Sequence, residues 1–414
     1  MIIRGGTVVT SEGVRQADIA IEDEWIVAVG DNADAGGEEI DATGLHIFPG
    51  GIDSHVHFNE PGHSDWETIA DGSAALAAGG YTCFVDMPLN NLPVTTTAAA
   101  FDAKVAAMQR SAKVDFGLWG GLVPGNAAEL RSMHERGALG FKAFMCPSGL
   151  DAFPASDVAT LREGMQRIAE LGSILLVHAE DPALLTTPGG PNAMDFIRSR
   201  PREAEVAAIR TLVELSRETG CQAHVVHVST AEGASLLAGN LSGETCPHYL
   251  LYVEEDMERI GGTAKCAPPF RTAADRDALW SMPMIVSDHS PSTLDLKQGD
   301  DFAKLWGGIS GCQSTRQLVL GAGMDAVTVA NVTSLNIARR FKLGNKGEIA
   351  AGYDADLWLV DLTQEDVVRR EDLLYKNKFS AHEGQKIRGR TVRTLVRGRD
   401  PAPGVGKPLT RSSR

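Results

Sequence analysis

Cysteines, basic residues and long apolar runs are all scarce in this 414-residue sequence. Its six cysteines include no C-x-x-C pair, which excludes a disulfide scaffold and indicates reduced thiols. No stretch approaches the roughly 20 apolar residues that a membrane helix needs, and the N-terminus lacks the pattern of a signal peptide. We therefore expect a soluble, cytoplasmic protein.

Lysine and arginine number 39 against 54 aspartate and glutamate residues, a formal net charge of −15 at pH 7. Such an excess repels phosphate backbones and anionic lipid surfaces, so we expect neither nucleic acid nor membrane as a partner. The composition, 43% hydrophobic and 22% charged, excludes disordered, collagenous and coiled-coil proteins. The length predicts one large domain and one smaller domain.

The two ends of the chain resemble each other in composition. The first 49 residues consist of short β-branched runs separated by turn residues, and similar runs return at Leu357–Val360 and Val392–Arg397. We predict that residues 1–49 and 344–414 form one small discontinuous β-sandwich domain around a central domain at 50–343. The tail Gly398–Arg414 is rich in proline, glycine and serine and is expected to be mobile.

The central region alternates short apolar runs with alanine-rich amphipathic segments. Eight such βα units predict an α/β fold of the (β/α)8 TIM-barrel type. A doubly wound open sheet is the alternative, but Gly50–Asp53 lacks the G-x-G-x-x-G turn typical of that fold. The last two expected strands are Glu244–His248 and Met284–Asp288. The connections at 238–243 and 280–284 are very short, and the sequence leaves open whether they are trimmed crossovers or omitted segments.

The strongest chemical signal is the pair His55 and His57 at the end of the first expected barrel strand. Strand alternation places residues i and i+2 on one face, so both imidazoles point the same way. Two histidines on one face at the carboxyl end of a barrel strand suit a divalent metal. The alternative is a pair of exposed or packed histidines without a ligand.

Four more polar residues fall at or near the ends of expected barrel strands, namely Lys142, His178, His227 and Asp288. Burying such groups unpaired is costly, so a ring of them at one barrel mouth favours a bound cation. A protonated lysine cannot bind a metal, but reaction with CO₂ would convert Lys142 into a carboxylate able to bridge two ions. The alternative for Lys142 is pairing with an acid inside the barrel.

Several motifs carry a family resemblance. The stretches Pro49–His57 and Asp288–Pro291, with the single lysine and histidines, resemble the cyclic-amidohydrolase branch of the amidohydrolase superfamily. Within that branch the chain is most similar to allantoinases, through the stretches Asn59–Gly62, Asp86–Pro93, Phe141–Gly149, Val177–Asp181, Glu244–Tyr249, Lys265–Pro269 and Trp306–Ile309. The resemblance covers essentially the whole chain and implies a homotetramer.

The resemblance implies a binuclear metal site. His55, His57 and Asp288 would hold one metal and His178 and His227 the other, with Lys142 as a bridging N6-carboxylysine. A hydroxide between the metals would attack an amide carbonyl of a five-membered ring, and Asp288 would act as general base and then general acid. Zinc is the expected metal, and cobalt, manganese and iron are alternatives.

Two differences from relatives bear on the substrate. Dihydroorotases carry an arginine for the substrate carboxylate two residues after the second histidine, where this chain has Asn59. Hydantoinases and dihydropyrimidinases carry a tyrosine shortly after the lysine, where this chain has Cys146–Ser148. Both differences favour allantoin, a neutral ureido-hydantoin.

Further substrate contacts are expected after strands 1, 2, 7 and 8, at Asn59, Asn90, Cys266, Ser290 and Gly308. Core filling is the alternative for Cys266, and a plain turn is the alternative for Gly308.

We expect hydrolysis of allantoin to allantoate, a step of purine and ureide breakdown. The alternatives are a hydantoinase or dihydropyrimidinase acting on another ring, and a non-catalytic scaffold related to dihydropyrimidinases. The scaffold hypothesis predicts missing metal ligands, whereas all six ligand positions are filled here.

Overall fold

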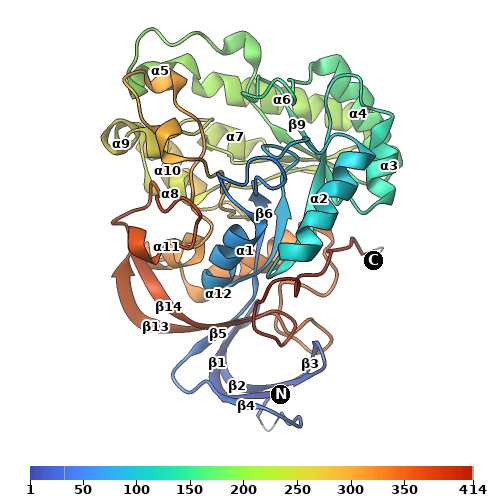
Figure 1. Cartoon of the computed structure of the whole chain (residues 1–414), viewed down its shortest axis with the longest axis vertical. Coiled ribbons are helices and arrows are strands. Elements are labelled where there is room, and N and C mark those ends of the chain that lie inside the picture. Colours follow the sequence, from blue (N-terminus) through green and yellow to red (C-terminus); the bar gives the residue numbers. More distant parts are fainter. Residues whose placement is uncertain (32, 413–414) are drawn as a thin grey trace.

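The computed structural model describes residues 1–31 and 33–412 and contains two seven-stranded sheets (Figure 1). One sheet is parallel and forms the wall of the barrel, with its helices packed outside. Its strands are β6 (Gly51–Val56), β7 (Tyr81–Asp86), β8 (Asp115–Gly121), β9 (Gly140–Phe144), β10 (Ile174–His178), β11 (Gln222–Val225) and β12 (Leu241–Gly243).

The α-helices alternate with these strands and continue after them. They are α1 (Ile69–Ala78), α2 (Ala98–Ser111), α3 (Glu129–Glu135), α4 (Val158–Glu170), α5 (Ala193–Ser199), α6 (Arg202–Thr219), α7 (Ala231–Ser235), α8 (Pro247–Leu251), α9 (Glu254–Ile260), α10 (Ala273–Leu279), α11 (Thr315–Gly321), α12 (Ala326–Ala330) and α13 (Asn336–Phe341). Side-chain caps start several of them; for example, Thr68 accepts a hydrogen bond from Asp71 N at α1.

The expected (β/α)8 barrel is confirmed, but its eighth strand is not a regular strand. Residues 284–289 lie in the eighth position, where Ile285 bridges Thr245 and His289 bridges Val56, both in parallel. Ile285 N donates to Val332 O instead of to a neighbouring strand. The chain then leaves the extended region at Asp288, where φ is 47°. These two features explain why Met284–Asp288 does not form a full ladder.

The predicted seventh strand, Glu244–His248, is wrong in its bounds. The strand β12 ends at Gly243, and Pro247 begins the helix α8. Proline fits the first turn of a helix because it has no N–H to leave unpaired there. His248 therefore lies on a helix. The short connections at 238–243 and 280–284 are accommodated by the five-residue helix α7 and by a turn after α10.

The chain ends share the second sheet, in the order β14-β13-β5-β1-β2-β3 with β4 beside β1. These strands are β1 (Ile2–Thr10), β2 (Gly13–Glu22), β3 (Trp25–Gly30), β4 (Glu39–Asp41), β5 (His46–Pro49), β13 (Leu357–Val367) and β14 (Lys386–Leu395). They enclose a separate apolar cluster that includes Ile19, Ile47 and Leu359. The proposed boundaries, 1–49 with 344–414 and 50–343, stay a prediction.

The described part of the C-terminal tail packs against the barrel, so the expectation of a mobile tail is wrong as far as residue 412. Phe116 N donates to Lys407 O at 3.0 Å, and Leu409 N donates to Phe116 O at 2.7 Å. These bonds form an isolated parallel bridge between Pro408 and Phe116 of β8. Residues 413–414 lie outside the described residues.

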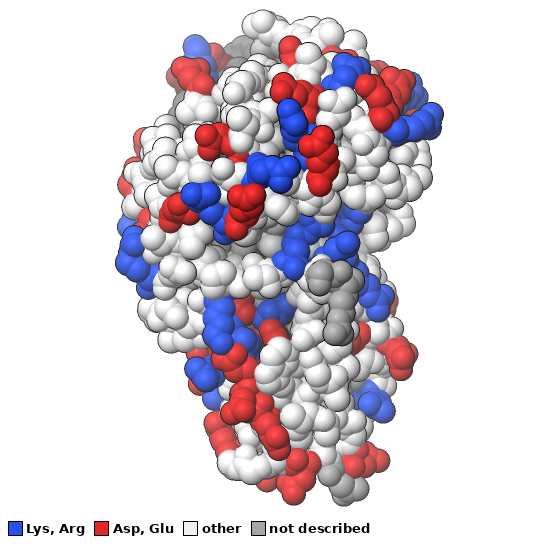
Figure 2. Space-filling view, turned by 90° about the vertical axis from the view of Figure 1, so that its right-hand side faces the viewer, with Lys and Arg blue, Asp and Glu red and all other residues white. Residues whose placement is uncertain are grey.

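The charged side chains on the surface and the polarity of the helices agree with the acidic, moderately hydrophobic composition. On the face shown in Figure 2, acidic and basic side chains are interspersed over the barrel, and acidic ones gather at the lower end, where β1–β4 lie. Among the described residues, no helix has the length and apolar character to cross a membrane.

Candidate metal centre and active site

A cavity of about 450 Å³ opens at the carboxyl ends of the barrel strands. All six side chains expected to bind metal line it: His55, His57, Lys142, His178, His227 and Asp288. They come from β6, β9, β10, the end of β11 and the eighth segment. This end of a barrel is where loops and strand termini build active sites.

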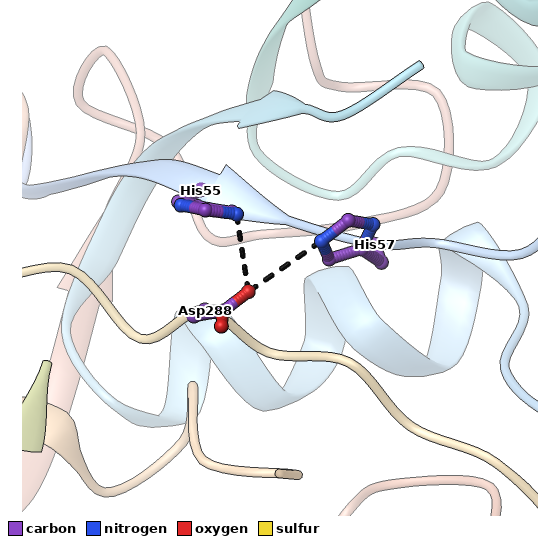
Figure 3. Close-up of side chains that lie close together, drawn as sticks. All are labelled: His55, His57 and Asp288. Carbon is purple, nitrogen blue, oxygen red and sulfur yellow. Dashed lines mark ion pairs between the residues drawn. The ribbon is translucent and has the colours of Figure 1, made fainter. Parts of the chain in front are cut away.

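The first group of candidate ligands is His55, His57 and Asp288 (Figure 3). Asp288 Oδ1 lies 3.0 Å from His55 Nε2 and 3.5 Å from His57 Nε2. The three ligand atoms lie within 4.8 Å of one another, so one ion could contact all of them. The ring of His57 is oriented by a 2.8 Å contact between its Nδ1 and Leu89 O.

Behind His55 lies a fully buried carboxylate, Glu244. Glu244 Oε1 is 2.7 Å from His55 Nδ1, and its Oε2 is 3.1 Å from His224 Nε2 and accepts from Ser54 Oγ at 3.2 Å. Burial raises the pKa of Glu244, but the hydrogen bonds to His224 and His55 outweigh burial and lower it to about 2. Glu244 is therefore an anion that holds a proton on His55 Nδ1 and leaves Nε2 free for a metal.

Within the first group, the charge on His55 and the charge on Asp288 stabilise each other. Burial lowers the pKa of His55, but Asp288 and Glu244 outweigh it and raise it to about 9. Burial raises the pKa of Asp288, but His55 outweighs it and holds that pKa well below its usual value. Asp288 thus carries a negative charge directed at two imidazoles, as expected for a carboxylate that binds a cation.

The second group is His178 and His227, whose Nδ1 and Nε2 atoms lie 3.1 Å apart. Burial lowers the pKa of both side chains, which favours the neutral imidazole that binds metals. Glu180 Oε2 lies 2.6 Å from His178 Nε2. Arg200 in turn donates to both oxygens of Glu180, at 2.5 and 3.1 Å.

Lys142 lines the same cavity as both groups. Its side chain is fully buried, and its Nζ has no hydrogen-bond partner and no ion pair among the described residues. Pairing with an acid in the barrel interior is therefore not what the structure shows. Burial lowers the pKa of Lys142 to about 7, which increases the fraction of neutral amine that can react with CO₂.

Of the five expected substrate contacts, Asn90, Cys266, Ser290 and Gly308 line the cavity. Asn59 is not among the lining residues that the structure describes. It is fully buried, and its Nδ2 donates to Pro291 O at 3.3 Å. The structure thus places Asn59 outside the cavity lining, bonded to the segment that follows Asp288.

Several polar residues at the site were not expected from the sequence: Glu180, Glu244, Arg200, Lys265 and Lys297. A signal existed for Glu180, because it follows His178 by two residues. Glu244 follows β12, which pairs with the strand of His224, and it meets His55 of β6 across the barrel, a contact that local sequence pattern does not predict. Arg200 and Lys265 come from the connections that follow α5 and a short 3₁₀-helix, and Lys297 ends another 3₁₀-helix.

Comparison with known proteins agrees with this geometry. Residues 46–399 match the Amidohydrolase family. The chain belongs to this family. Among curated family members it is 47% identical to an allantoinase of Rubrobacter xylanophilus, over 96% of this chain and 93% of that one. It is 45% identical to an allantoinase of Solibacter usitatus, over 96% and 92%.

Solved structures of the amidohydrolase family give the same picture. An L-hydantoinase (dihydropyrimidinase) from Arthrobacter aurescens superimposes with a TM-score of 0.95 at 31% identity, covering 99% of each chain. A dihydropyrimidinase from Brevibacillus agri gives 0.91 at 28% identity, covering 100% of this chain and 98% of that one. The family resemblance inferred from the motifs is confirmed.

Proposed function

We propose that this chain is an allantoinase that hydrolyses the cyclic amide of allantoin to allantoate, in purine and ureide breakdown. The observation that carries the proposal is near full-length identity of 45 to 47% to allantoinases. The cavity supports it, because six ligand-type side chains meet there at the catalytic end of a barrel. A scaffold protein without activity would have no need to keep this set together.

The donor set fits two divalent metals. His55, His57 and Asp288 would hold one, and His178 and His227 the other, with Lys142 as an N6-carboxylysine between them. The unpartnered, buried Nζ of Lys142 supports the modification, because a carboxylate there would gain ligands that the amine lacks. Imidazole and carboxylate donors suit zinc, cobalt, manganese and iron, of which we expect zinc. When bound, such metals polarise an amide carbonyl and lower the pKa of water.

The protein's own groups supply positioning and proton transfer. Asp288 would take the proton of the attacking water and deliver it to the ring nitrogen as the C–N bond breaks, so that it ends unprotonated. Asn90, Cys266, Ser290 and Gly308 would contact the substrate. We also propose a homotetramer, from the resemblance, and a cytoplasmic location, which the six free, buried cysteines support.

The test is a panel of ring-opening rates. Metal-depleted protein would be reconstituted with zinc, cobalt or manganese plus bicarbonate, and then assayed on allantoin, hydantoin, dihydrouracil and dihydroorotate. Metal-dependent turnover dominated by allantoin is the expected result. Preferred turnover of hydantoin or dihydrouracil would instead support the hydantoinase alternative, which the 0.95 TM-score to an L-hydantoinase favours. Protein that binds no metal and opens no ring would support the scaffold alternative.

A further inference from the structure

Residues 303–308 line one side of the cavity, and we call this segment the cavity wall. Two lysines from outside the segment hold it by its backbone. Lys265 Nζ donates to Ala303 O at 2.7 Å and to Leu305 O at 2.6 Å. The Lys265 backbone also accepts a bond from Gly308 N at 2.7 Å. The wall is thus tied to the Lys265 loop at three points.

Lys297, at the end of a short 3₁₀-helix (Leu294–Lys297), completes the arrangement. Its Nζ donates to Trp306 O at 2.9 Å and also to Gly308 O. Together the two ammonium groups use four of the six carbonyl groups in the wall. A charged donor forms a stronger hydrogen bond than a neutral one, so the two lysines fix the backbone of the wall at four positions.

Neither lysine has an ion-pair partner within 4.0 Å among the described residues, although both are about 95% buried. Burial lowers the pKa of Lys265 to about 8 and that of Lys297 to about 7. Burying an ammonium group without a counter-ion is unfavourable by several kcal/mol, even after relaxation. The two lysines therefore do not serve the overall stability of the fold. Their effect is on the backbone conformation of residues 303–308.

The wall contacts the segment that carries Asp288. At Gly308, where φ is 134°, an added Cβ would lie 2.6 Å from Ser290 O. Ser290 N donates to Ile309 O at 3.0 Å. Ser290 follows Asp288 by two residues, so the wall packs against the segment that carries Asp288.

Gly307 is an exposed residue of the wall whose peptide groups have no partner among the described residues. Neither its N–H nor its C=O bonds to another described residue, and it has no side chain to cover them. A ureido group carries both N–H donors and a carbonyl acceptor, so it is complementary to a free peptide N–H and C=O.

We propose that Lys265 and Lys297 are positioning residues that hold the cavity wall in place for the ureido arm of the substrate. The inference rests on the proposed function, since the arm is what distinguishes allantoin from hydantoin. The lysines act through the backbone of the wall and do not touch the reacting amide.

The experiment compares Lys265→Met and Lys297→Met with Lys378→Met, an exposed lysine outside the cavity that serves as the matched control. Methionine keeps the length of the side chain but removes the donor. Hydrogen exchange of residues 303–309 and steady-state rates on allantoin would be measured, with hydantoin as a second substrate or a competitive inhibitor. We expect faster exchange in the wall and a KM for allantoin raised about tenfold or more, since small displacements near a reacting group are costly. Hydantoin binding should change much less.

An equal loss of binding for allantoin and hydantoin, or unchanged hydrogen exchange in residues 303–309, would overturn the inference. If a methionine variant does not fold, Lys265→Gln removes the charge but keeps a shorter donor group, and it allows the same comparison. Wild-type turnover of allantoin is measured first. If the wild type does not turn over allantoin, the proposed function itself is refuted. If the wild type is active but the variants lose allantoin and hydantoin binding equally, only the role of the lysines is refuted.

Discussion

Glu244 Oε1 lies 2.7 Å from His55 Nδ1, behind the imidazole that lines the cavity. Because Glu244 is a buried anion, it fixes the tautomer of His55 and turns the lone pair of Nε2 toward Asp288. The contact has the geometry of the carboxylate–histidine pairs that support metal ligands. His224 and Ser54 hold Glu244 from the other side, so its position is determined by three partners.

Glu244→Gln should weaken metal binding without abolishing it. The glutamine amide keeps the size of the side chain but loses the charge that favours the Nδ1–H tautomer. We expect a metal affinity about 10- to 100-fold lower, measured by competition with a chelator, and activity restored by excess metal. Glu232→Gln is the control, because its side chain is about half exposed and pairs with Arg210. An unchanged metal Kd would refute the tautomer argument.

Lys142→Met should remove the group that we propose as the carboxylated bridge. Methionine preserves the buried volume but cannot react with CO₂. We expect turnover to fall at least about 100-fold, because the metals contribute several kcal/mol of transition-state stabilisation. The activity of the wild type should depend on bicarbonate after metal depletion, and that of the variant should not.

A complementary variant, Lys142→Ala, leaves room for a small free carboxylate. Acetate or propionate should restore part of its turnover, whereas amines of the same size should not. Equal rescue by amines, or wild-type activity that is indifferent to bicarbonate, would contradict carboxylation. Intact mass spectrometry under native conditions provides a direct readout of the added CO₂.

The barrel and the ends of its strands were predictable from local pattern. Strand alternation puts His55 and His57 on one face, and the repeating βα unit brings residues as distant as Lys142 and Asp288 to one barrel mouth. Both arguments depend only on backbone geometry, which is the same in every parallel barrel.

The expectations that failed depended on contacts that local pattern does not contain. Asn59 was expected to contact the substrate because it stands where dihydroorotases carry an arginine. That contact stays a prediction, but Asn59 does not line the cavity, and its Nδ2 donates to Pro291 O. The eighth strand was expected to be regular, but Ile285 N is bonded to Val332 O of a neighbouring helical segment. Lys265 and Lys297 lie at the ends of short 3₁₀-helices, where neither spacing nor periodicity predicts a partner.

Lys346 should matter for stability and not for catalysis. Its Nζ lies 2.6 Å from Asp115, 2.6 Å from Asp354 and 2.8 Å from Asp356, all largely buried. Asp115 begins β8, so this cluster joins the end of the barrel remote from the cavity to the sheet of the chain ends. Lys346→Met would leave three carboxylates without that counter-ion.

We expect Lys346→Met to lower the free energy of unfolding by about 3–5 kcal/mol, as for other broken buried ion pairs. Chemical denaturation would measure it, and kcat of the folded fraction should be unchanged. Lys378→Met, at an exposed lysine with a single 3.4 Å bond to Glu371 O, should have little effect. A loss of kcat in the folded Lys346→Met protein would show that the cluster influences the cavity.

His382 predicts a pH dependence of stability. It is buried, stacks on Tyr252 with ring centroids 5.6 Å apart, and places Nδ1 3.1 Å from the Tyr252 hydroxyl. Burial, with a smaller contribution from His248, lowers the pKa of His382 to about 3. In the unfolded chain its pKa returns to about 6.5.

Between pH 6.5 and 3 the unfolded state therefore binds one more proton at this residue than the folded state. The contribution of His382 is fully present above pH 6.5 and is lost as the pH falls, by about 1.4 kcal/mol per pH unit. His382→Asn, which retains a donor for the Tyr252 hydroxyl, should flatten the acid limb of the stability curve by one proton. Denaturation of metal-free wild type and variant across this range measures the difference in slope directly. Parallel curves would mean that His382 already carries its proton in the folded protein, and that its stack on Tyr252 tolerates the charge.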